Sequence, residues 1–186
     1  SEAKEDAEKQ NKLLLTEADY DLACDMAEEC LTHPMGAKLL NNKELITEAS
    51  FFVTCPETGL GLKTRPDGFL ASAGLILDVK TCQDASLNGF SKALRNFNYS
   101  LQQSFYRYCL EIEGIKISNF IFIAIEKEKP HATACYELSD KYDRDARQEM
   151  MQTLHKIKRA KETNDYSTGW PDLETLSLPP WLDGEI

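Results

Sequence analysis

The feature that most constrains the fold of this chain is a short apolar segment that ends in two charged residues. The segment reads Gly74-Leu75-Ile76-Leu77-Asp78-Val79-Lys80. It is apolar through most of its length, which is typical of a strand in the centre of a sheet. Because side chains alternate along a strand, Asp78 and Lys80 project from the same face. A buried carboxylate and ammonium are costly without compensation, so we expect a special environment at this strand end.

The elements around this segment predict one mixed sheet. The expected strands are Glu48–Cys55, Leu60–Phe69, Gly74–Lys80, Ile117–Ile125 and Ala132–Leu138. The expected helices begin at Thr16, Pro34, Ser86 and Asp140 and end near His33, Asn41, Glu113 and Glu162, with a break in the third near Asn96–Asn98. This order of helices and strands predicts an α/β fold in which helices flank a mixed central β-sheet.

Length and charge narrow the class of protein. The chain has 186 residues, which suits a single domain, expected over residues 16–182 after a frayed acidic segment at 1–15. No apolar run approaches the ~18 residues of a membrane span, so we expect no membrane partner and a cytoplasmic location. The formal net charge is −10, but residues 31–161 hold eighteen bases and fifteen acids. The acidity is therefore terminal, and an acidic substrate is not excluded.

Carboxylates near the central strand predict a site for a divalent cation. Asp67 lies at the end of the preceding hairpin, and Glu48 is expected to begin the first strand. Two or three carboxylates with water and a substrate phosphate describe a Mg²⁺ site for phosphoryl transfer. Beside such a metal, Lys80 would orient or deprotonate water and offset negative charge. From spacing alone, a simple salt bridge between Asp78 and Lys80 is an equally good interpretation.

Several ordered motifs resemble those of one nuclease family. They are the run Glu48–Leu60, Arg65-Pro66-Asp67, Leu77-Asp78-Val79-Lys80-Thr81, Gln102-Gln103-Ser104-Phe105-Tyr106 and Leu178-Pro179-Pro180-Trp181. Asp67 followed by Asp78-Val79-Lys80 resembles the core of the PD-(D/E)XK nucleases. The glutamine-to-tyrosine motif is similar to that of RecB-like nucleases, and the whole set resembles RecE-type exodeoxyribonuclease VIII and its phage relatives. The resemblance covers roughly residues 15–182.

The resemblance implies roles for the residues of the central strand. It assigns metal binding to Asp67 and Asp78, with the backbone carbonyl of Val79 as a further ligand. It assigns Glu48 to a second metal and makes Lys80 the catalytic lysine. The cofactor it implies is Mg²⁺, for which Mn²⁺ would substitute.

The same resemblance extends the site to the helix that follows. Gln102 and Tyr106 are four residues apart and so share one helix face, which suits a pair that reaches a single site. On their own, they would be interpreted as a core tyrosine with a capping glutamine. Lys92 and Arg95 follow the central strand and are the residues that we expect to contact DNA. The family's upstream GxxxH motif has no counterpart here, and we interpret His33 as a structural residue or helix cap.

The function implied by the resemblance is digestion of linear double-stranded DNA from its 5′ ends. Such an enzyme exposes 3′ single strands for phage-type recombination, with a single-strand annealing protein as a partner. Related exonucleases form rings, which implies a homo-oligomer, by analogy a tetramer. Two alternatives stay open: a DNA-binding or assembly module of the same fold with weakened catalysis, and a restriction-like endonuclease.

Overall fold

The computed structural model describes residue 12 and residues 14–175. Its helices are α2 (Glu17–Thr32), α3 (Pro34–Leu40), α4 (Leu87–Asn96), α5 (Tyr99–Ile112) and α6 (Asp140–Thr163), with a short 3₁₀ turn η1 (Ala71–Ala73). Its strands are β1 (Ile46–Thr47), β2 (Phe51–Thr54), β3 (Gly61–Thr64), β4 (Gly68–Leu70), β5 (Leu75–Cys82), β6 (Asn119–Glu126) and β7 (Thr133–Glu137). Within this part of the chain, no helix is both long and apolar enough to cross a membrane.

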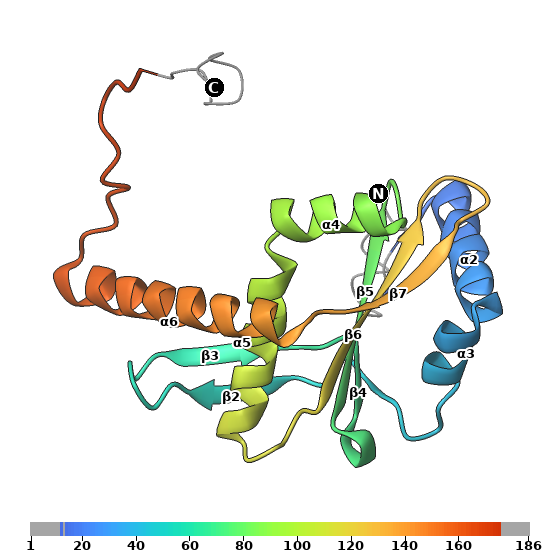
Figure 1. Cartoon of the computed structure of the whole chain (residues 1–186), viewed down its shortest axis with the longest axis horizontal. Coiled ribbons are helices and arrows are strands. Elements are labelled where there is room, and N and C mark those ends of the chain that lie inside the picture. Colours follow the sequence, from blue (N-terminus) through green and yellow to red (C-terminus); the bar gives the residue numbers. More distant parts are fainter. Residues whose placement is uncertain (1–11, 13, 176–186) are drawn as a thin grey trace.

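A five-stranded sheet in the order β1-β4-β5-β6-β7 forms the centre of the fold (Figure 1). Strands β5 and β6 are parallel, and every other neighbouring pair in this sheet is antiparallel. The expected mixed sheet is therefore confirmed, and the segment with Asp78 and Lys80 is its middle strand.

Helices cover both faces of this sheet. On one face, Phe122 and Ala124 of β6 pack with Phe90 and Leu94 of α4. On the other, Ile123 of β6 and its neighbours pack with Cys30 of α2, Met26 of the same helix and Leu40 of α3. Adjacent residues of β6 thus face opposite layers, and both layers are apolar. This explains why the strand sequence has no polar alternation.

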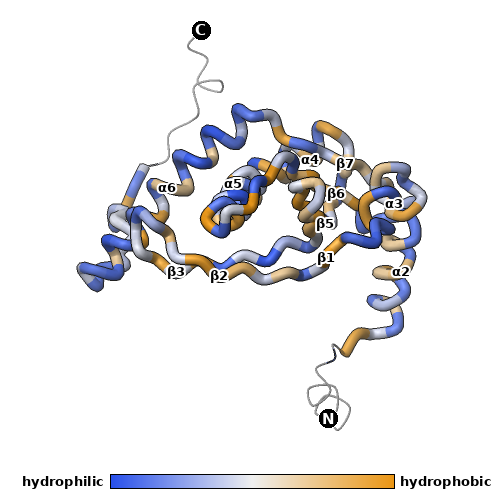
Figure 2. Tube along the Cα trace, turned by 90° about the horizontal axis from the view of Figure 1, so that it is seen from below, coloured by the Kyte–Doolittle hydropathy of each residue, from blue (hydrophilic) through white to orange (hydrophobic). Residues whose placement is uncertain are grey.

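The hairpin preceding the central strand differs from the expectation. Strands β2 and β3 form a separate two-stranded sheet, and α5 lies between this hairpin and α6 (Figure 2). The predicted strand Leu60–Phe69 is wrong as a single element, because it divides into β3 and β4. Pro66 lies at the division, and a proline has no backbone N–H to donate to a sheet ladder.

The helix after β5 breaks where the sequence predicts. Helix α4 ends at Asn96, and α5 begins at Tyr99. Asn98 between them has φ of 51°, a left-handed conformation that asparagine tolerates better than most residues. The side chain of Thr16 caps the first helix by accepting a hydrogen bond from the backbone N–H of Asp19 at 3.1 Å. The expected frayed segment 1–15 lies mostly outside the described residues, and the motif at residues 178–181 lies wholly outside them.

Candidate active site

The centre of the site is Asp78, a buried carboxylate in the middle of the sheet. Its relative exposure is 1%. One carboxylate oxygen, Oδ2, accepts a hydrogen bond from Nε2 of Gln102 at 2.9 Å. The other, Oδ1, forms an ion pair with the ammonium of Lys80. Both carboxylate oxygens of Asp78 are therefore engaged by polar side chains, one by Gln102 and one by Lys80.

Burial dominates the electrostatics of Asp78. It raises the pKa of this carboxyl from 3.8 to about 6, although the Lys80 ammonium and Gln102 both act to lower it. The neighbouring Asp67 carboxylate contributes in the same direction as burial. A carboxylate with this environment is short of positive charge, because desolvation penalises its ionised form.

Asp67 lies beside Asp78, immediately before the adjacent strand β4 begins. Its Oδ2 accepts a hydrogen bond from the backbone N–H of Val79 at 2.7 Å. The last antiparallel pair of β4 and β5 joins Gly68 to Leu77. One step further along this register brings Asp67 opposite Asp78. The two aspartates that the sequence singled out are therefore brought together by strand pairing.

Glu48 lies next to Asp67 across the sheet, but its carboxylate points to Arg65 and not to the two aspartates. Its backbone N–H donates to the carbonyl of Asp67 at 3.2 Å, which places it next along the row of paired residues. Its Oε2 lies 2.8 Å from Nε of Arg65, in an exposed ion pair. The prediction that Glu48 begins a strand is wrong, because it follows β1 with φ of 57° and precedes β2. This left-handed residue turns the chain between two different sheets.

Lys80 is held between a carboxylate and an aromatic ring. Its side chain is 16% exposed, and its ammonium contacts Asp78 on one side. On the other side, Nζ lies 4.8 Å from the ring centroid of Tyr99. Such a cation–π contact stabilises a partly desolvated ammonium. Sequence reasoning missed Tyr99, whose only signal is its position as the first residue of α5 after the predicted helix break.

Helix α5 places Gln102 and Tyr106 next to the strand that carries Asp78. Gln102 reaches Asp78 directly, so the core-and-cap interpretation of the glutamine is not what the structure shows. Tyr106 lies one turn further, half-buried beside Phe120. Burial raises the pKa of Tyr106, whereas the side chains of Gln102 and Thr64 act to lower it. Tyr106 therefore lies near the glutamine that holds the central carboxylate.

The expected DNA-contacting residues lie on α4. Lys92 and Arg95 are both exposed, and Lys92 lines a cavity of about 500 Å³ at the carboxyl end of β5. Arg95 lies in the last turn of the helix and does not line that cavity. His33 acts as a helix cap, as expected, because its Nδ1 accepts a hydrogen bond from the backbone N–H of Gly36 at 3.2 Å.

The donor set fits a hard divalent cation with few protein ligands. Among residue 12 and residues 14–175, no group of three or more histidine, cysteine, aspartate or glutamate side chains is placed to hold a metal ion. Mg²⁺ does not need such a cage, since one or two carboxylates with water and substrate phosphate suffice. The residues that would hold it are Asp67 and Asp78, because the Asp67 carboxylate bonds to the backbone of β5 next to Asp78 and lies close enough for its charge to raise the pKa of Asp78.

This fold, with one aspartate just before β4, a second on the neighbouring β5 and a lysine two residues after the second, defines a protein of the PD-(D/E)XK superfamily. The profile of the PDDEXK-like domain of unknown function (DUF3799) matches residues 1–171. The chain therefore belongs to this family, and the superfamily predicted from the sequence is confirmed.

A solved structure shares the fold. A crystal structure from Eubacterium rectale, of a protein provisionally described as an exonuclease, is similar with a TM-score of 0.68 at 16% identity. The match covers 98% of this chain and 73% of that one, and at this identity it establishes the fold alone. The structure of SSO0001 is more distant, with a TM-score of 0.39 and 16% identity over 81% of this chain and 83% of that one. A comparison with curated proteins finds no match.

Proposed function

We propose that this protein is a metal-dependent deoxyribonuclease, specifically a RecE-type exonuclease that digests linear double-stranded DNA from its 5′ ends. The observation that carries the proposal is the convergence of Asp67, Asp78 and Lys80. Strand register pairs the two aspartates, and side-chain alternation puts the lysine on the same face as Asp78. The structure contains the salt bridge between Asp78 and Lys80 that the spacing also allowed, and the support for a nuclease is the second carboxylate, Asp67, held beside it by the backbone N–H of Val79.

The chain's own residues supply orientation and charge for the reaction. Bound Mg²⁺ would polarise the phosphate and lower the pKa of water. Gln102 fixes one oxygen of Asp78 by its hydrogen bond, and the Lys80 ammonium contacts the other, so that the orientation of the carboxylate is set before a metal binds. Lys80, steadied by the ring of Tyr99, orients the attacking water and offsets charge that develops on the phosphate.

The wider role is proposed from the family resemblance. The enzyme would work in the cytoplasm of a bacterium or phage-infected cell, exposing 3′ strands for an annealing protein during recombination. A chain of net charge −10 binds duplex DNA weakly as a monomer, because affinity grows with the number of phosphates neutralised. A closed ring, a tetramer by analogy, would gather the basic face of each subunit around the duplex.

The direct test is digestion of linear duplex DNA with Mg²⁺ or Mn²⁺, with closed circular DNA of the same sequence in parallel. The proposed exonuclease degrades only the linear DNA, and chelation with EDTA abolishes the reaction. Cleavage of the circle would identify a restriction-like endonuclease instead. Light scattering at micromolar concentration tests the assembly, and a monomer would contradict the ring.

One observation favours the second candidate, a DNA-binding module with weakened catalysis. The Glu48 carboxylate is bonded to Arg65 rather than directed to the paired aspartates. In that case linear DNA would be bound but not degraded under any metal. The nuclease is favoured by the adjacent backbone positions of Glu48, Asp67 and Asp78. It is also favoured by the buried ion pair between Asp78 and Lys80.

A further inference from the structure

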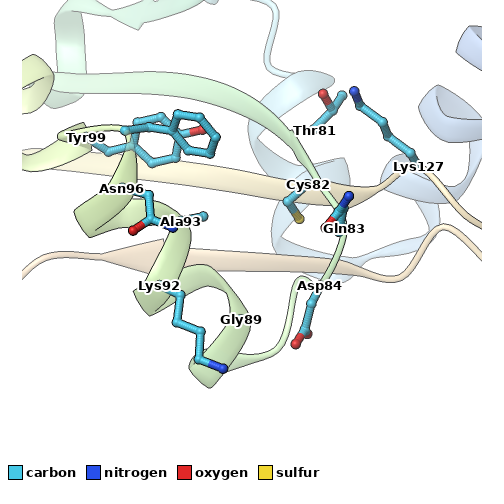
Figure 3. A pocket seen from close by; sticks show the side chains of 11 residues that line it. Thr81, Cys82, Gln83, Asp84, Gly89, Lys92, Ala93, Asn96, Tyr99 and Lys127 are labelled. Carbon is cyan, nitrogen blue, oxygen red and sulfur yellow. The ribbon is translucent and has the colours of Figure 1, made fainter.

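A cavity of about 500 Å³ opens at the carboxyl end of β5, next to the candidate active site. Its position is fixed by the parallel pair β5 and β6, whose ends meet there, and by α4, which forms its other wall. The residues that define its character are Thr81, Cys82, Lys92, Asn96, Tyr99 and Lys127. Figure 3 shows Lys92 and Asn96 on the helix side and Thr81 and Lys127 on the strand side.

The cavity is continuous with the environment of Lys80. Cys82 lies two residues beyond Lys80 and therefore projects from the same face of β5, about 7 Å further along the strand. Tyr99 belongs to both places, because its ring contacts the Lys80 ammonium and also lines the cavity. A molecule in this cavity would lie further along β5 than the paired aspartates, on the side of the Lys80 ammonium that Tyr99 covers.

The charges in the cavity favour an anion. Lys92 and Lys127 come from different elements and are both exposed. The one carboxylate of the lining, Asp84, is engaged by the backbone N–H of Ser86 at 2.9 Å. The lining therefore has an excess of one positive charge, and both ammonium groups lie where solvent or a ligand reaches them.

An exposed aromatic platform completes the cavity. Phe97 lines it and is 68% exposed. Its ring stacks on Tyr99, with centroids 5.6 Å apart and planes 22° from parallel. A large apolar ring left open to solvent beside a cationic pocket is the arrangement that holds a nucleobase, because every base offers a face for stacking.

We propose that this cavity binds one nucleotide of the DNA strand being cut, the nucleotide next to the scissile bond that becomes the released monophosphate. Its base stacks on Phe97, and Lys92 and Lys127, on opposite sides of the cavity, supply the positive charge that attracts its non-scissile phosphate. This assignment rests on the proposed nuclease function and adds a specific site to it. It explains why the cavity combines two lysines with an aromatic ring and shares Tyr99 with the surroundings of Lys80.

Calorimetric titration with deoxyadenosine monophosphate tests the site in EDTA, where no cleavage takes place. Wild-type protein is expected to bind the nucleotide, and Lys92→Ala and Lys127→Ala each weaken binding about tenfold or more, the effect of losing one charge-assisted hydrogen bond. The matched control is Lys43→Ala, which removes one charge from an exposed position before β1. Because β1 runs parallel to β5, Lys43 lies at the opposite end of the sheet.

Inorganic phosphate as a second probe separates the two halves of the pocket. Phe97→Ala is expected to weaken nucleotide binding by about fivefold or more, the range for one lost base stack, and to leave phosphate binding unchanged. Phe97 is exposed, so its truncation spares the core. Equal affinity of the wild type for phosphate and nucleotide would overturn the base site. Absence of nucleotide binding, or equal weakening by Lys43→Ala, would overturn the pocket.

The titration tests the nucleotide pocket and the nuclease assay tests the catalytic role, so the two proposals can be contradicted independently. Nucleotide binding without cleavage of linear DNA would retain the pocket and reject the catalytic role. Cleavage without nucleotide binding would retain the nuclease and reject the pocket.

Discussion

Replacing Asp78 with asparagine should stabilise the metal-free protein at neutral pH. Asparagine keeps the size of the side chain and removes the charge that burial penalises. The pKa of Asp78 is about 6 in the folded protein, against an ordinary value of 3.8. Between these two pH values the folded state binds more protons than the unfolded state, so the free energy of unfolding falls as pH rises.

The expected size of this effect follows from the pKa difference. About two pKa units correspond to about 3 kcal/mol, at 1.36 kcal/mol per unit. The cost is absent below pH 3.8 and fully present above about pH 6. The gain from Asp78→Asn should therefore grow from near zero at pH 4 to about 3 kcal/mol at pH 7.5, or roughly 6–12 °C in Tm for a domain of this size.

Thermal and urea unfolding in EDTA, from pH 4 to pH 8, measure this gain. Asp21→Asn is the control, because Asp21 is an exposed carboxylate on α2 whose replacement should leave the pH profile unchanged. Added Mg²⁺ should stabilise the wild type by mass action and leave Asp78→Asn unaffected. A pH-independent difference between wild type and variant, or equal Mg²⁺ stabilisation of both, would refute the reasoning.

Three further substitutions test the surroundings of the site. Lys80→Ala should lower kcat by roughly 10²-fold or more while the Mg²⁺-induced rise in Tm persists; loss of both would make Lys80 structural. Arg65→Ala should release the Glu48 carboxylate from its ion pair and tighten Mg²⁺ binding, which Mg²⁺ titration would show, while weaker binding would exclude Glu48 from the site. Gly74→Ala should lower the free energy of unfolding by about 1–3 kcal/mol, since φ is +57° and a Cβ would lie 2.6 Å from the carbonyl oxygen of Lys116. Gly61→Ala is its control, because a Cβ there meets nothing within 4 Å, and equal destabilisation by both would contradict the argument.

The sequence predicted the central strand and its charged face because those features are local. A contiguous apolar run predicts a buried strand. Because side chains alternate along any strand, Asp78 and Lys80 share one face regardless of which strands lie beside it. The helix break at Asn98 was predictable for the same reason, since it depends on a few adjacent residues. Each of these predictions needed no knowledge of which strands pair.

Strand pairing itself was beyond the sequence pattern. Residues 48–69 have the alternation of a hairpin, but alternation does not state which sheet a strand joins. Only the structure shows that the chain leaves the small sheet at Pro66 and enters the large one at Gly68. The same transition explains why Glu48 was misplaced, because its left-handed turn lies at the other junction between the two sheets.

Contacts between distant segments were also invisible in the sequence, and Tyr99 is the clearest case. Its ring reaches Lys80 only because α5 crosses the sheet face that β5 presents. The spacing of Gln102 and Tyr106 favoured one helix face, yet the partner of that face had to come from the resemblance. The hydrogen bond from Gln102 to Asp78 gives this partner a physical basis.

The position of the site also explains why the core tolerates a buried charge. Asp78 is buried on the middle strand of a sheet that has an apolar layer on each face, and an apolar residue there would pack without an electrostatic cost. The Lys80 ammonium and the hydrogen bond from Gln102 offset this cost only in part, because the pKa of Asp78 is still raised to about 6. A cation that bound beside Asp78 would gain from the charge that destabilises the metal-free fold, so the energy lost in folding would return as metal affinity. In the proposed enzyme, the β5 strand is therefore both the structural centre of the sheet and the place where folding stability is exchanged for metal affinity.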